Sequence, residues 1–292
     1  MELSVIIVSY NVREFLKDCL ISVKKSSEKI DCEIFVVDNN SADGSGEMVR
    51  NEFPEVKLIR NSENRGFSAA NNQAIKESAG QYLLLLNPDT IVEEDTFSKC
   101  IYFMNKHNNA GALGVRMVNG EGRFLPESKR ALPKPAIAFF KVFGISFLFP
   151  RSKVFNRYNL SSIDSFETSL TEVVSGAFMF IRRTALLKAG LPDEDFFMYG
   201  EDIDLSYRIL RAGYRNYYFP EVQITHFKGK STNRDSYTDI FNFYSAMRIY
   251  SRKRQEEKFT FLYFLIIPAI YFREGISMLI RFFRNNLPVF IL

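Results

Sequence analysis

Acidic side chains follow short apolar runs at several places in this sequence, where a carboxylate is unusual. Asp38 ends the run EIFVVD, Asp89 follows LLLLNP, and Glu201 and Asp202 follow the aromatic segment FFMYG. A carboxylate avoids apolar surroundings unless a cation or a hydrogen-bond donor accompanies it. Acids placed in this way suit two kinds of chemistry, the binding of a divalent cation and the removal of a proton from a hydroxyl.

Asp89 is the first candidate metal ligand, because Pro88 restricts the backbone that presents its carboxylate. A second protein ligand is needed, and His226 follows the strand-like run YYFPEVQIT. A buried histidine with purely structural hydrogen bonds would give the same pattern. A carboxylate and an imidazole together would suit Mn²⁺ or Mg²⁺.

Asp202 is the candidate general base, with Glu201 beside it at the start of a predicted helix. The aromatic residues before this pair should partly desolvate it and raise the pKa of the carboxylate toward the working pH. The alternative is that these acids only cap the helix, since the helix dipole favours negative charge in the first turn.

Over the first 110 residues the sequence pattern predicts alternating strands and helices, and these elements must position the acids. Apolar runs at 3–10, 33–39, 56–61 and 82–87 predict strands of a mostly parallel central sheet flanked by helices, an α/β fold. Ligands of such sheets bind beyond the carboxyl ends of the strands. The polar residues expected there are Ser9, Tyr10, Asn11, Asp38, Asn39, Asn40, Asn87 and Asp89.

A nucleotide is the predicted ligand of this edge. Asp38 suits a pyrimidine N–H or a ribose hydroxyl, unless it only caps a helix. Arg65 could reach a nucleobase or phosphate, unless it forms a surface salt bridge, and Gly66 permits close backbone approach. Asn71 is a further hydrogen-bonding candidate, although a solvated helix face would explain it nearly as well.

The composition limits the classes of protein to which this chain can belong. A net charge of +4 and a pI of about 8.8 are too mildly basic to predict nucleic-acid binding. Three cysteines without C-x-x-C spacing predict reduced thiols in a cytoplasmic protein. The start MELSVIIVSYN lacks the basic region of a signal peptide, so none is expected.

Six segments, taken in order, resemble the bacterial family 2 glycosyltransferases, and the rhamnosyltransferase-like branch in particular. They are VIIVSYN, VVDNNSADGS, NRGFSAANN, LLLNPDT, VSGAFMFIRR and FFMYGEDIDLSYR, and the resemblance spans about residues 3–230. It implies a GT-A (Rossmann-like) fold and a role in surface polysaccharide synthesis.

The resemblance also implies roles for single residues. In similar enzymes the second acid of the Glu-Asp pair is the base, here Asp202, and a metal-binding histidine stands where His226 does. Many relatives carry an acid where this chain has Asn87, which could hydrogen-bond a ribose but adds no charge. The implied reaction is inverting transfer from dTDP-rhamnose or a UDP-sugar to a glycan or lipid-linked acceptor, with weak metal binding in the absence of nucleotide.

The expected organisation is a catalytic domain over residues 1–230 and a helical extension over 231–292. Within the first, residues 1–110 would bind the nucleotide sugar, and 111–230 would hold the acceptor and the base. The apolar run 259–272 is shorter than the ~20 residues that span a bilayer. Nearby basic residues favour peripheral attachment to the inner face of the cell membrane: Arg248, Arg252, Lys253, Arg254, Lys258, Arg273, Arg281 and Arg284. The alternatives for this extension are a helical lid and a homodimer contact.

Two other functions remain open from the residues alone. A nucleotidyltransferase acting on sugar phosphates would also use a nucleotide-binding α/β sheet with acidic metal ligands, but SYNVREFLKD is not its glycine-rich basic loop. A non-catalytic membrane-associated scaffold would explain the extension but not the acids gathered at strand ends.

Overall fold

The computed structural model describes residues 1–133, 164–228, 236–257 and 261–286. Within these residues the central sheet has nine strands in the order β3-β2-β1-β4-β8-β6-β9-β5, with β7 paired to β9. The strands are β1 Leu3–Ser9, β2 Cys32–Asp38, β3 Lys57–Arg60, β4 Tyr82–Leu86, β5 Thr90–Val92, β6 Ala110–Val118, β7 Ser169–Thr171, β8 Phe178–Arg182 and β9 Arg215–His226. The predicted α/β fold is confirmed.

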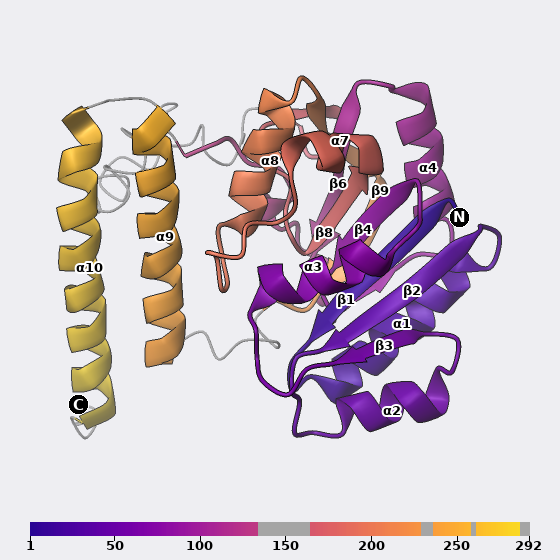
Figure 1. The fold of residues 1–292 in the computed structure, drawn as a ribbon, viewed down its shortest axis with the longest axis horizontal. Helices are drawn as coiled ribbons and strands as arrows, with labels where there is room; N and C mark the ends of the chain where they lie inside the picture. Colours follow the sequence, from indigo (N-terminus) through magenta and orange to yellow (C-terminus); the bar gives the residue numbers. More distant parts are fainter. Residues whose placement is uncertain (134–163, 229–235, 258–260, 287–292) are drawn as a thin grey trace.

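Helices cover both faces of this sheet because the strands alternate two apolar faces (Figure 1). Side chains such as Val5 and Ile7 pack on one face with α1, α2 and α4, and Ile6 and Val8 pack on the other with α3, α7 and α8. The helices are α1 Arg13–Ser27, α2 Ser45–Glu52, α3 Phe67–Glu77, α4 Thr96–Lys106, the 3₁₀ turn η1 Pro126–Ser128, α7 Arg183–Ala189 and α8 Glu201–Arg211.

The sheet is parallel in its first half and mixed in its second. β3, β2, β1 and β4 run parallel, whereas β8 lies antiparallel between β4 and β6. β5 and β7 are also antiparallel to β9. Parallel pairing therefore joins β1 to β4, as expected, and also joins β6 to β9, whereas β5, β7 and β8 pair antiparallel with their neighbours.

The sheet register brings distant polar residues to one edge. Ser9 lies opposite Asp38 in the β1–β2 pair. The short β5 pairs with the end of β9 and places Thr90 opposite His226. This pairing brings Asp89, the residue before β5, next to a histidine 137 positions later (226 − 89).

Helices α9 (Tyr237–Glu257) and α10 (Phe261–Asn286) form an antiparallel pair beside the α/β body, with α9 nearer to α8 (Figure 1). Tyr244 of α9 packs with Ile266, Ala269 and Ile270 of α10 in a small core of their own. Within the described residues, no helix combines the length and apolar character needed to cross a bilayer. Residues 259 and 260 of the predicted apolar run lie outside the described residues.

The basic residues of α9 do not form the free cationic surface that the sequence suggested. Arg248 is ion-paired with Glu274 of α10, Arg254 with Asp204 of α8, and Lys253 contacts acidic residues before α8. Arg252 is exposed. The side chains of Lys258 and Arg284 lie outside the described part. Most of the described positive charge of α9 is therefore used inside the protein.

Candidate active site

A cavity of about 300 Å³ opens at the carboxyl ends of β1 and β4. It brings together parts of the chain that are more than 200 residues apart in the sequence. Its walls include Tyr10, Asn39, Asn64, Gly66, Asn87, Pro88, Glu127, Arg130, Gly176, Phe197, Met198, Tyr199, Glu201, Asp202, His226 and Lys228. Seven predicted site residues are among them: Tyr10, Asn39, Gly66, Asn87, Glu201, Asp202 and His226.

The acid pair stands at the first turn of α8, which begins after Gly200 in the left-handed conformation (φ 82°). Asp202 Oδ2 accepts hydrogen bonds from Arg130 Nη2 at 2.5 Å and from the Gly176 N–H at 3.1 Å. Its Oδ1 accepts one from the Ile203 N–H at 2.8 Å. These donors fix the carboxylate at the cavity wall, which a general base requires.

Glu201, the first acid of the pair, has a carboxyl oxygen buried beside the charge of Asp202. Burial, followed by the neighbouring charge of Asp202, raises the pKa of Glu201 to about 8. Its Oε2 is buried and accepts no hydrogen bond from the described residues. Burial therefore favours the protonated, neutral form of the Glu201 carboxyl at pH 7.

Asp89 and His226 form the second polar centre. Asp89 is buried, and its Oδ1 lies 3.4 Å from His226 Nε2. The Phe227 N–H donates to the Asp89 carbonyl at 2.9 Å, so backbone pairing fixes both residues. His226 Nδ1 is buried without a hydrogen-bond partner among the described residues.

This pair fits part of a divalent cation site. The Asp89 carboxylate and the His226 nitrogen that faces it, Nε2, are suitable ligands for Mn²⁺ or Mg²⁺. In the described part of the chain, no group of three or more His, Cys, Asp or Glu side chains could hold a metal ion. Oxygen atoms from a ligand would have to complete the coordination shell.

Two cationic side chains that the sequence analysis did not select also line the cavity. Arg130 contacts Asp202, and Lys228 is ion-paired with Glu127. Nothing local marks Arg130, because its partner lies 72 residues away. The sequence marks Lys228 as a candidate only weakly, by its position two residues after His226.

Asp38 and Arg65 do not line the cavity. Asp38 is buried, accepts a hydrogen bond from the Ser41 N–H at 2.9 Å and has Arg60 Nε at 3.6 Å. Arg65 is exposed. The neighbouring Asn39 lines the cavity instead, and it contacts Asn64 and the Gly66 carbonyl. The nucleotide-binding roles of Asp38 and Arg65 stay predictions.

The other predicted nucleotide-binding residues lie in the surrounding shell. Asn11 (φ 53°) accepts a hydrogen bond from the Ala42 N–H at 2.7 Å, and Asn40 (φ 70°) is exposed. Ser9 is buried, and its hydroxyl has no partner among the described residues. Asn71 is buried and donates to the Phe67 carbonyl at 2.9 Å. None of these four predicted residues lines the cavity.

Gly66 joins the two halves of the site. Its backbone (φ 80°, ψ 173°) lies in a region that is essentially restricted to glycine. A Cβ there would lie 2.6 Å from the Phe197 carbonyl oxygen, which accepts a hydrogen bond from the Phe67 N–H at 2.7 Å. The predicted close backbone approach therefore occurs, but to the protein's own chain.

Residues 4–188 match the family model described as glycosyl transferase family 2, which is more than half of the chain. The chain belongs to glycosyl transferase family 2. It is therefore a glycosyltransferase, as the sequence motifs predicted. The matched region contains Asp38, Asp89 and Arg130 but ends before Glu201, Asp202 and His226.

Two relatives are similar over most of the chain. The N-acetylglucosaminyl-diphospho-decaprenol L-rhamnosyltransferase of Mycobacterium tuberculosis is 27% identical over 244 residues, covering 80% of this chain and 78% of that protein. The low-salt glycan biosynthesis hexosyltransferase Agl10 of Haloferax volcanii is 27% identical over 214 residues, covering 72% and 62%. The rhamnosyltransferase-like prediction is confirmed.

Solved structures share the fold at low sequence identity. The mannosyltransferase PcManGT from Pyrobaculum calidifontis, in complex with GDP-Man and Mn²⁺, has a TM-score of 0.60 at 17% identity, covering 95% of this chain and 75% of that one. S. aureus TarS 1–349 in complex with UDP-GlcNAc has a TM-score of 0.57 at 18% identity, covering 99% and 77%. The GT-A fold is confirmed.

Proposed function

We propose that this glycosyltransferase is inverting and metal-dependent and moves a sugar from dTDP-rhamnose or a UDP-sugar to a lipid-linked acceptor or a glycan in surface polysaccharide synthesis. The observation that carries the proposal is the single cavity shared by the Glu201–Asp202 pair and His226, which adjoins Asp89. The named relatives supply the rhamnosyl donor and the lipid diphosphate acceptor as candidates.

The proposed chemistry follows from the two polar centres. Asp202 takes the proton of the acceptor hydroxyl, whose oxygen bonds to the anomeric carbon as the bond to the diphosphate oxygen breaks. Attack from the face opposite the leaving group inverts that carbon. Asp89 and His226 would hold a Mn²⁺ or Mg²⁺, which would offset the charge of the leaving diphosphate.

A donor screen tests the proposal. We expect UDP- or dTDP-sugars with Mn²⁺ to raise the melting temperature, GDP-sugars to raise it less, and a synthetic N-acetylglucosaminyl-diphospho-prenol to trigger release of nucleoside diphosphate. A nucleotidyltransferase would instead form a sugar nucleotide from a sugar phosphate, and a scaffold would do neither. Failure of every donor to bind would contradict the proposal.

We also propose that α10 attaches the protein peripherally to the inner face of the cell membrane. Support comes from the apolar residues of α10 whose side chains are more than half exposed, among them Phe272, Leu279, Ile280 and Phe283. Positions 272, 279 and 283 share one helix face, and the exposed Arg273 suits anionic lipid. This proposal places the surface on α10 rather than on the ion-paired residues of α9.

Replacing both Phe272 and Phe283 by glutamate should weaken binding to vesicles containing phosphatidylglycerol by about tenfold or more, because two aromatic rings no longer enter the interface. Flotation with vesicles measures this. Tyr102→Glu is the matched control, since Tyr102 is 60% exposed but lies on α4 in the catalytic body. Equal binding by the control and the double variant would contradict attachment through α10.

A further inference from the structure

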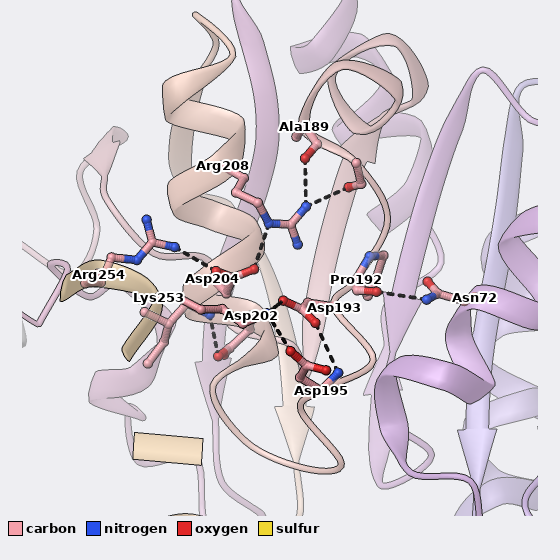
Figure 2. Close-up of polar contacts among 12 residues, drawn as sticks. Asn72, Ala189, Pro192, Asp193, Asp195, Asp202, Asp204, Arg208, Lys253 and Arg254 are labelled. Carbon is pink, nitrogen blue, oxygen red and sulfur yellow. Dashed lines mark hydrogen bonds and ion pairs between the residues drawn. The ribbon is translucent and has the colours of Figure 1, made fainter. Parts of the chain in front are cut away.

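Helix α9 is joined to the wall of the cavity by side-chain contacts (Figure 2). Lys253 is ion-paired with Asp193 and, at 2.8 Å, with Asp195. Arg254 is buried and donates to Asp204 of α8 at 2.7 Å. These contacts fix α9 both to α8 and to the segment that precedes it.

That segment, residues 193–199, is here called the 193–199 loop. Phe197, Met198 and Tyr199 of the loop line the cavity, and the chain continues directly into Glu201 and Asp202. On its other side the loop is attached to α3, because Asn72 Nδ2 donates to Glu194 at 2.8 Å and Phe67 to the Phe197 carbonyl. The loop therefore connects the two halves of the site, and its shape affects both.

The C-terminal end of the loop is held by a second contact from α9. Tyr199 has a positive φ (69°), a conformation that an aromatic residue rarely adopts unless its surroundings hold it. Its hydroxyl donates to Asp239 Oδ1 at 2.5 Å, and its ring lies edge-on to Phe243 of the same helix. The hydrogen bond to Asp239 and the ring contact with Phe243 therefore hold Tyr199 in this backbone conformation.

The N-terminal end of the loop is held by charge. Burial opposes ionisation of Asp193, but the hydrogen bond from Lys253, the hydrogen bond from the Asp195 N–H and the charges of Lys253 and Arg208 together hold the pKa of Asp193 below its ordinary value. Lys253 is 30% exposed and Asp193 23%, so solvent screens this pair only in part.

We propose that Asp239 and Lys253 are positioning residues for sugar transfer, which fix the two ends of the 193–199 loop so that Phe197 and Tyr199 form the acceptor wall of the cavity. This inference rests on the proposed function. The loop belongs to the acceptor side because it adjoins α9, whose partner α10 would lie on the membrane that carries the acceptor. We assign the nucleotide side to Asn39, Asn64 and Gly66, which line the same cavity, and Gly66 is where this side meets the loop at Phe197.

Lys253→Ala tests the inference against a matched neighbour, Arg252→Ala. Both variants remove one positive charge from α9, but Arg252 is exposed and no ion pair joins it to the described residues. We expect Lys253→Ala to speed hydrogen exchange over 193–200 and to raise the KM for N-acetylglucosaminyl-diphospho-prenol, each by about tenfold. Arg252→Ala should change neither the exchange rate nor the KM. Lys253→Arg keeps the positive charge, so both quantities should stay close to their wild-type values. Binding of the nucleoside diphosphate should stay within about twofold in all variants.

A second pair of variants tests the other end of the loop. Tyr199→Phe and Asp239→Ala remove the same hydrogen bond from opposite sides, so the double variant should raise the acceptor KM no more than either single change. Equal exchange and equal KM for Lys253→Ala and Arg252→Ala would overturn the inference. So would faster exchange with an unchanged KM, because the contact would then be structural only. If the wild-type protein transfers no sugar, the proposed function fails, and unchanged exchange in Lys253→Ala would separately show that Lys253 does not anchor the loop.

Discussion

Replacing Asp202 by asparagine should slow sugar transfer by about a hundredfold or more, the usual contribution of a general base. Asparagine keeps the size of the side chain, and its carbonyl oxygen can still accept from Arg130 and the Gly176 N–H. The fold and nucleotide binding should therefore survive, and kcat should fall. Single-turnover transfer and nucleotide-induced thermal shifts measure the two effects separately.

Glu201→Gln is the matched control for this variant, because both acids lie in the same turn and line the same cavity. Burial raises the pKa of Glu201 to about 8, so glutamine imitates the neutral form present at pH 7. We expect transfer at pH 7 to fall by less than about tenfold, far less than in Asp202→Asn. The opposite order of losses would assign the base to Glu201, and near-wild-type turnover of Asp202→Asn would exclude Asp202 as the base.

The same two variants should differ in their dependence on pH. A carboxyl whose pKa is raised in the folded state adds stability that is fully present below its unfolded pKa, near 4.5, and is lost as the pH rises through about 8. The contribution of Glu201 to the melting temperature of the wild-type protein should therefore fall as the pH rises from about 5 to about 8. In Glu201→Gln the melting temperature should lack this pH-dependent fall. In Asp202→Asn part of the fall should remain, because burial is the first cause of the raised pKa of Glu201 and the charge of Asp202 only the second.

The sequence predicts the first half of the fold well because each buried strand is marked locally. Runs such as LSVIIVS and YLLLL are apolar on both faces, which is typical of a strand covered by helices on each side. The polar residues that follow these strands are equally local signals. Tyr10 and Asn87 could therefore be placed at the cavity from their position after β1 and β4 alone.

The rest depends on contacts between distant parts of the chain, which no local pattern marks. Arg130 meets Asp202 across 72 residues, and Lys253 reaches Asp193 across 60. The basic residues of α9 resemble a membrane-binding cluster in sequence, but Arg248 and Arg254 are buried in ion pairs. Charge in a sequence shows that a partner is needed, and only the fold shows which partner is present.

Replacing Asp89 by asparagine or His226 by alanine should abolish the part of nucleotide stabilisation that depends on Mn²⁺. With one carboxylate and one imidazole from the protein, the cation needs donor oxygens as further ligands. Wild-type protein should therefore show a large thermal shift with Mn²⁺ and nucleoside diphosphate together, and a small one with Mn²⁺ alone. The backbone hydrogen bond between Phe227 and Asp89 does not involve either side chain, so both variants should fold.

His107→Ala is the matched control for His226→Ala, because these are the chain's two histidines. His107 stacks on Phe103 at the end of α4, with 4.0 Å between ring centroids, and its Nδ1 lies 2.9 Å from the Phe103 carbonyl. Its loss should lower the melting temperature slightly but leave the Mn²⁺-dependent shift unchanged. Equal loss of that shift in both histidine variants would remove His226 from the metal site. Tight binding of Mn²⁺ to the nucleotide-free protein would require a further protein ligand beside Asp89 and His226, since two ligands leave most of the coordination shell of the ion to water or phosphate.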